Sequence, residues 1–263
     1  MDFFSFPPIA FLLTLLASAL DALSSLLDPL LGAASAAGGV VLLTLIVRVL
    51  LTPVAVAQVR AEGARRRLAP VFAELRRRWK GDPQRLQQKT MKVYRDAGVS
   101  PVAGIGSALL QAPIVSLVYA LFIAQQIGGE PNSLLAESLL GVVLGRPLGL
   151  AVLTGGGGGA LVLVGAVIVL LVAAGLATRA MMLRLQRTSA QPGMAPAPPG
   201  IPPAVMGALG WLPLLTVPIA FVVPLAAALY LVTTTLWTLA ERPLLRRLLW
   251  GPEEWGAARL SPT

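Results

Sequence analysis

The sequence contains neither cysteine nor histidine among its 263 residues, and it has few charged side chains. A chain without cysteine forms no disulfide and no thiolate metal site. A chain without histidine lacks the commonest zinc ligand and the usual proton carrier of enzymes. Charged residues make up 13% of the chain, about half the fraction that is typical of a soluble domain. These absences argue against a metal centre, an enzyme active site and a soluble fold, and no cofactor is expected.

Hydrophobic residues, in contrast, make up 56% of the chain, and the mean hydropathy is +0.78. Several apolar runs approach the roughly 20 residues that a membrane-spanning helix needs. Arginine far outnumbers lysine, and alanine, glycine and proline are abundant, as is typical of proteins from GC-rich bacterial genomes. The sequence therefore predicts an all-α polytopic membrane protein in a bacterial plasma membrane.

The charged residues are unevenly distributed, and their distribution predicts the topology. Residues 59–99 are strongly basic, whereas residues 1–38 and 128–159 together contain acidic residues and a single basic one, Arg146. Because basic loops stay on the cytoplasmic side, we expect the N-terminus outside and the C-terminus in the cytoplasm. The basic segment could instead bind nucleic acid, but it lies between two predicted spans, so no DNA partner is expected.

Hydropathy and the positions of the prolines divide the chain into five predicted transmembrane helices and the segments that join them. The spans are residues 39–58, 100–127, 160–180, 204–219 and 222–240. The external segments are residues 1–38 and 128–159, and the cytoplasmic ones are the hairpin 59–99, the proline-rich linker 181–203 and the tail 241–263.

Residues 9–31 are apolar but carry a polar stripe at helical spacing, formed by Thr14, Ser18, Asp21, Ser25 and Asp28. This pattern favours an amphipathic helix on the outer membrane surface, with a further span as the alternative. The lack of basic residues before the apolar run argues against a signal peptide. Gly38 and Gly39 are predicted to separate this helix from the first span.

The basic segment 59–99 has the pattern of two short helices. The first carries an apolar stripe, and the second carries apolar residues of its own. Gly81 is predicted to end the first helix, and Asp82 followed by Pro83 supplies the N-cap and first residue of the second. Facing stripes predict an antiparallel helical hairpin; they consist of Leu68, Phe72, Leu75 and Trp79 and of Leu86, Val93, Tyr94 and Ala97.

Polar residues occur at helical spacing on three of the predicted spans. Arg48 is the most informative, because a cation near the middle of a span costs roughly 2.5–3.5 kcal/mol and should face water or a partner. Together these polar residues could line a water-filled groove. They are Thr44, Arg48 and Thr52 on the first span, Ser107 and Gln111 on the second, and Tyr230, Thr234 and Trp237 on the last. The alternatives are bonding of Thr44 and Thr52 to their own helix, a snorkelling Arg48, helix–helix contact through Gln111 and an interfacial place for Tyr230 and Trp237.

Four segments together resemble one family. Residues 44–53 (TLIVRVLLTP) are similar to the first core helix of the YidC-type membrane protein insertases, bacterial relatives of the mitochondrial and chloroplast inner-membrane insertases. Residues 79–88 (WKGDPQRLQQ) resemble the hairpin turn of that family, and residues 94–114 resemble its entry into the next span. Residues 224–230 (PLAAALY) resemble the signature of its last helix. The resemblance extends over residues 39–240, most of the chain.

The resemblance implies a fold and a function. Five transmembrane helices would surround a hydrophilic groove that opens to the cytoplasm and to lipid but is closed on the outer side. Arg48 would be the positive charge of this groove, and the hairpin with Trp79, Gly81, Asp82 and Pro83 would help to receive substrates. The chain would insert nascent membrane proteins and help them fold without ATP hydrolysis, in contact with the lipid bilayer, and the ribosome and the Sec translocon are further candidate partners.

The sequence also departs from the family pattern. Leu231 stands where the family usually has tryptophan, and Thr235 stands where asparagine is common. The third predicted span contains no glutamine, so Thr178 is its nearest polar residue. These differences bear on the range of substrates more than on the fold.

Two other classes of function remain as alternatives. A small transporter or channel would usually place several ionisable residues near the midplane, often within internal repeats. Here the predicted spans contain Arg48 and, at the end of the third, Arg179, but no carboxylate. A membrane-embedded hydrolase would need a catalytic base, which a chain without histidine or a membrane carboxylate does not supply. A scaffold for other membrane proteins is compatible with insertion.

Overall fold

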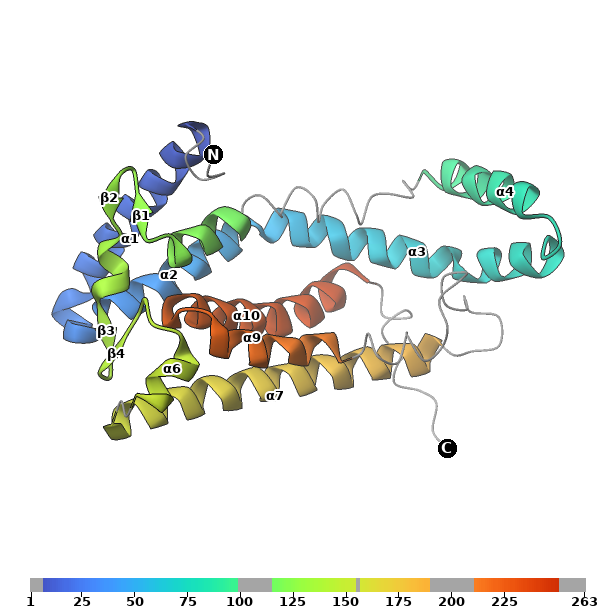
Figure 1. Cartoon of the computed structure of the whole chain (residues 1–263). Coiled ribbons are helices and arrows are strands. Elements are labelled where there is room, and N and C mark those ends of the chain that lie inside the picture. Colours follow the sequence, from blue (N-terminus) through green and yellow to red (C-terminus); the bar gives the residue numbers. More distant parts are fainter. Residues whose placement is uncertain (1–6, 99–114, 155–156, 190–210, 251–263) are drawn as a thin grey trace. The chain divides into compact units, whose positions relative to one another are not determined.

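The computed structural model describes residues 7–98, 115–154, 157–189 and 211–250 (Figure 1). Ser107 and Gln111, predicted for the second span, lie outside these residues, and so do residues 190–203 of the predicted linker. The chain divides into two compact units. Unit 1 comprises Met1–Leu51, Ala112–Leu176 and Pro213–Leu239, and unit 2 comprises Thr52–Gln111, Ala177–Leu212 and Ala240–Thr263.

Helices account for nearly all of the regular structure among the described residues, in agreement with the predicted class. The exceptions are two antiparallel strand pairs that the sequence reading missed. β1 (Gln126–Ile127) pairs with β2 (Glu130–Pro131), and β3 (Ser138–Leu139) pairs with β4 (Val142–Val143). A short 3-10 helix, η3 (Ser133–Ala136), lies between the two pairs.

Unit 1 begins with two helices that fold back on each other. α1 (Pro7–Leu31) leads through η2 (Gly32–Ala34) into α2 (Ser35–Leu50). The chain turns at Gly32, whose φ of +50° favours glycine. The predicted break at Gly38 and Gly39 is therefore wrong, because both residues lie inside α2 and let it pack closely against α1.

Unit 2 contains the predicted hairpin. A one-residue turn at Leu51 separates α2 from α3 (Thr52–Arg78), so residues 39–58 comprise parts of two helices rather than one. Pro53 at the second position of α3 is compatible with this start, because the first amides of a helix need no intrahelical acceptor. α4 (Pro83–Asp96) folds back beside α3 (Figure 1).

The remaining helices fall at positions that differ in part from the prediction. Residues 115–123 are helical, and α6 (Leu148–Leu153) precedes α7 (Gly157–Ser189). η4 (Leu212–Leu215) and α9 (Thr216–Val222) lead to α10 (Leu225–Leu249). α7 continues past residue 180 and α10 past residue 240, so the linker and the tail begin as helix. The turn predicted between the helices 204–219 and 222–240 lies at Val223 and Pro224.

Within the described residues, two helical stretches are long and apolar enough to cross a membrane. They are Pro7–Leu50, which comprises α1, η2 and α2, and Gly157–Arg184 in α7. The five spans of the sequence analysis remain a prediction.

The N-terminus of α10 is held in the core of unit 1 by backbone hydrogen bonds from a distant loop. The Leu225 and Ala226 amides donate to the carbonyls of Arg146 and Leu144, at 2.9 and 3.0 Å. These amides would otherwise be unpaired, since the first N–H groups of a helix have no intrahelical acceptor. Residues 225–228 are completely buried, so this loop fixes the start of the helix that carries Tyr230 and Thr234.

Candidate functional site

Arg48 and Tyr230, which are 182 positions apart in the numbering, are brought together in unit 1. Arg48 lies in the last turn of α2 and is partly exposed. Its guanidinium group lies beside the hydroxyl of Tyr230, close enough to interact with it. The ring of Tyr230 also contacts the rings of Tyr119 and Phe122, with centroids 6.5 and 5.8 Å away. The cation therefore lies at the edge of an aromatic cluster and is not enclosed by aliphatic side chains alone.

Two further predicted residues lie on the same helix as Tyr230. Thr234 and Trp237 follow it by four and seven positions, so the three residues share one face of α10. Thr234 Oγ1 and Trp237 Nε1 are buried, and no hydrogen bond of good geometry reaches either atom among the described residues, although the Thr234 hydroxyl lies close enough to that of Tyr230 to interact with it. Since buried polar groups are normally paired, a water molecule or a polar group of a bound segment would satisfy them.

The predicted threonines of the first span fall in different units and have different surroundings. Thr44 is buried, with 1% of its surface exposed, and its hydroxyl donates to the Val40 carbonyl at 2.7 Å. This is the alternative in which the threonine bonds its own helix. Thr52 begins α3 in unit 2, where its hydroxyl donates to Glu241 Oε1 at 3.4 Å. Leu51 separates the helices that carry the two residues, so a shared polar face of Thr44, Arg48 and Thr52 stays a prediction.

The hairpin of unit 2 has the predicted local structure. Asp82 accepts a hydrogen bond from the Arg85 amide at 3.0 Å and caps α4, with Pro83 as its first residue. Phe72 on α3 meets Tyr94 on α4 with ring centroids 4.8 Å apart. The guanidinium of Arg85 lies 5.5 Å from the ring of Trp79. Apolar residues of α3 and α4 thus face each other, and the basic residues Arg77, Arg78 and Arg85 are exposed.

Glu74 on α3 forms exposed ion pairs with Arg78 at 2.6 Å and Arg77 at 2.8 Å. Hydrogen bonds from Arg78 and then Arg77 lower the pKa of Glu74 below its usual value. Because the folded-state pKa is the lower one, the pairs stabilise the hairpin above the unfolded-state pKa and lose this contribution as the pH falls through the folded-state pKa. We expect a carboxyl-carbon NMR titration to give Glu74 a midpoint below the usual value for glutamate, and the midpoint should move back toward that value when Arg78 and Arg77 are both replaced by alanine.

A polar cavity of about 520 Å³ lies in unit 1 beside α1. Part of the predicted polar stripe, Asp21, Ser25 and Asp28, lines it together with Ser133 and Glu137 of the external segment. The stripe is exposed, while Leu13 and Leu20 of α1 are buried in the core. α1 also packs against α2, and its exposed surface includes large apolar residues such as Phe11, Leu15 and Leu26 besides the stripe.

Comparison with known proteins supplies the family. The family model described as 60Kd inner membrane protein matches residues 27–250, most of the chain. The chain belongs to this family. Among its relatives is a membrane protein insertase YidC from Clostridium perfringens, 36% identical over 31% of this chain and 34% of that protein. Another protein of the same name, from Campylobacter jejuni, is 34% identical over 32% of this chain and 16% of that protein.

A third YidC relative, from Streptomyces avermitilis, is 29% identical over 41% of this chain and 26% of that protein. The matched segments thus cover about a third or less of each of these three relatives. Membership confirms the predicted resemblance to the YidC-type family and agrees with a membrane protein rich in apolar helices.

Two polar features of this YidC-family chain escaped the sequence analysis. The side-chain amide of Asn132 donates hydrogen bonds to the carbonyls of Leu121 and Ala124, both at 2.9 Å. These carbonyls lie at the C-terminal end of helix 115–123, where carbonyls have no donor within the helix. The second feature joins Glu62 of α3 to Arg246 of α10, across 184 positions of sequence. Neither has a clear sequence signal, because the first depends on how the loop after residue 124 folds back and the second on how distant segments pack.

Proposed function

We propose that this chain is a membrane protein insertase and chaperone, which inserts nascent membrane proteins into a bacterial plasma membrane and helps them fold. Membership of the YidC family supports this class of function. The observation that carries the mechanism is the partly exposed Arg48 beside Tyr230. Tyr230 shares its face of α10 with the buried polar groups of Thr234 and Trp237.

The mechanism lowers a desolvation barrier. A nascent protein carries a short polar, often acidic, segment across the membrane, and that segment loses hydration on the way. In the proposed water-filled groove, Arg48 attracts the acidic groups, and Tyr230, Thr234 and Trp237 offer hydrogen bonds in place of water. The substrate helix then gains roughly 25 cal/mol per Å² of apolar surface that leaves water. This gain drives the step, so no ATP hydrolysis is needed.

The same proposal covers the parts that receive and hold the substrate. Five transmembrane helices, with the N-terminus outside and the C-terminus in the cytoplasm, would surround the groove. The basic hairpin of α3 and α4 would meet substrates on the cytoplasmic side, where the ribosome and the Sec translocon are candidate partners. The polar end of the hairpin around Trp79 and Asp82 suits contact with water and with polar partners.

Site-specific crosslinking in reconstituted vesicles tests the proposal. A photoreactive residue is placed at position 44, 48 or 230 of the purified protein, and a ribosome-held nascent chain with one apolar helix is added without ATP. We expect crosslinks from positions 48 and 230 together with protease-protected insertion. Leu153, an exposed residue of α6, is the control position and should give no crosslink. Insertion no faster than in empty vesicles would refute the function, and insertion without these crosslinks would refute the site.

A further inference from the structure

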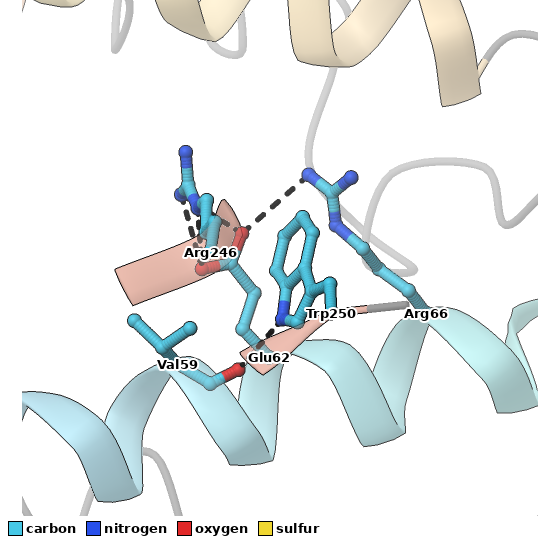
Figure 2. Close-up of polar contacts among 5 residues, drawn as sticks. All are labelled: Val59, Glu62, Arg66, Arg246 and Trp250. Atoms are coloured by element: carbon cyan, nitrogen blue, oxygen red, sulfur yellow. Dashed lines mark hydrogen bonds and ion pairs between the residues drawn. The ribbon is translucent and has the colours of Figure 1, made fainter. Parts of the chain in front are cut away.

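A cluster of interlocking side chains joins the C-terminal end of α10 to α3 within unit 2 (Figure 2). Glu62 and Arg66 of α3 face Arg246 in the last turn of α10 and Trp250, the residue after Leu249. Arg246 and Trp250 are four positions apart, as are Glu62 and Arg66, so each pair occupies one helical face. We call this the 246–250 latch; it comprises Glu62, Arg66, Arg246 and Trp250.

The ion pair in the latch is buried on the arginine side. Arg246 has only 6% of its surface exposed. Its Nη2 lies 2.9 and 3.0 Å from the two carboxylate oxygens of Glu62, and its Nε donates to Glu62 Oε2 at 3.3 Å. A buried arginine that loses its carboxylate is left without compensation for its lost hydration, so breaking such a pair is strongly unfavourable. The pair therefore holds the two helices together once they are docked.

Trp250 supplies the second half of the latch. It is 5% exposed, and its indole N–H donates to the Val59 carbonyl at 3.2 Å. The Arg66 guanidinium lies 4.6 Å from the ring centroid and also pairs with Glu62 at 3.5 Å. A Cβ at Gly63 would lie 2.8 Å from the indole nitrogen, which is closer than van der Waals contact allows. Glycine at this position thus lets the ring lie against the α3 backbone.

We propose that Glu62, Arg246 and Trp250 are positioning residues, which dock the end of α10 on α3 and so present the cytoplasmic hairpin to substrates in one orientation. α3 forms one arm of that hairpin, and Phe72 links it to α4. The end of α10 is apolar as well as charged, since Leu245 is buried in the same cluster as Val59. The link to substrate delivery rests on the proposed function, whereas the docking itself does not.

The lack of native cysteine allows a direct test by distance measurement in the full-length protein. Cysteines at the exposed positions Arg60 on α3 and Leu248 on α10 carry spin labels, and the distance distribution between them is recorded in vesicles. We expect one narrow distribution for the otherwise unchanged chain. Glu62→Gln should broaden it, with the undocked fraction rising at least about tenfold, because Arg246 loses its carboxylate.

Glu74→Gln is the matched control, because it makes the same substitution on the same helix but breaks an exposed pair, which contributes little. It should leave the distribution narrow. Gly63→Ala leaves all charges in place but puts a methyl group where the Trp250 ring lies, so it should displace the ring and also broaden the distribution. If Glu62→Gln lowers accumulation of the protein, Gly63→Ala still decides whether the latch exists. A narrow distribution in either variant would overturn the docking.

Insertion assays on the same variants test the positioning role. We expect Glu62→Gln and Gly63→Ala to insert substrates severalfold more slowly than Glu74→Gln, which changes the same hairpin helix but keeps the latch. Broad distances with unchanged insertion would overturn the role in delivery. Absence of insertion by the unmodified chain would refute the proposed function instead, and the distance measurements would still report on the latch.

Discussion

Replacing Arg48 by alanine should slow the insertion of substrates with acidic external tails at least about tenfold. Two opposite charges 4 Å apart in an effective dielectric of 20 attract by about 4 kcal/mol, and roughly a third of that value corresponds to a tenfold change in rate. The loss concerns the step in which the acidic tail leaves bulk water. Single-turnover insertion into vesicles, with protease protection of the tail as the readout, measures it.

Two comparisons separate the charge of Arg48 from its packing. Arg48→Lys keeps a cation in the last turn of α2 and should retain most of the rate for acidic tails. A substrate whose tail carries no acidic residue should be inserted by Arg48→Ala at close to the rate of the unmodified protein. If Arg48→Ala slowed acidic and neutral tails by the same factor relative to the unmodified protein, Arg48 would not act through its charge.

The local parts of the hairpin could be predicted because their causes lie within a few residues. Asp82 and Pro83 stand where a helix begins, and the amide that Asp82 caps belongs to Arg85, three positions away. The contact of Phe72 with Tyr94 follows from two stripes joined by a short turn. In both cases the sequence spacing fixes which groups can meet.

The candidate site was predictable only in part, because its residues come from helices that are far apart in the sequence. Apolar surroundings and helical spacing identified Arg48, Tyr230 and the face of α10, but their approach depends on packing between α2 and α10. The turn at Leu51 has no strong signal before Pro53, so Thr52 was assigned to the same helix as Thr44 and Arg48 although it begins α3. The pairing of Glu62 with Arg246 spans 184 positions, and charge patterns do not select one partner over that separation.

Gly39 also shows that packing between helices is hard to predict from sequence. Its replacement should have the second large effect, which is on the stability of unit 1. A glycine pair in an apolar run predicts a break, yet Gly39 is buried inside α2. A Cβ at this position would collide with the Ser24 hydroxyl of α1 and lie 3.3 Å from Leu20 Cδ1. We therefore expect Gly39→Ala to lower the free energy of unfolding of unit 1 by about 1–3 kcal/mol through overpacking. Each kcal/mol lost should lower the midpoint of thermal unfolding by roughly 2–4 °C. Thermal unfolding in detergent measures the shift.

Gly165→Ala is the matched control, since Gly165 lies inside α7 with no atom near the place of a Cβ. Alanine there should stabilise the helix by about 0.5–1 kcal/mol, because glycine loses more backbone freedom on folding. Ser24→Ala removes the oxygen that Gly39→Ala would meet, so the double variant should recover a large part of the lost stability. If Gly39→Ala raised the midpoint as Gly165→Ala does, close packing of α1 on α2 would not be the reason for a glycine at position 39.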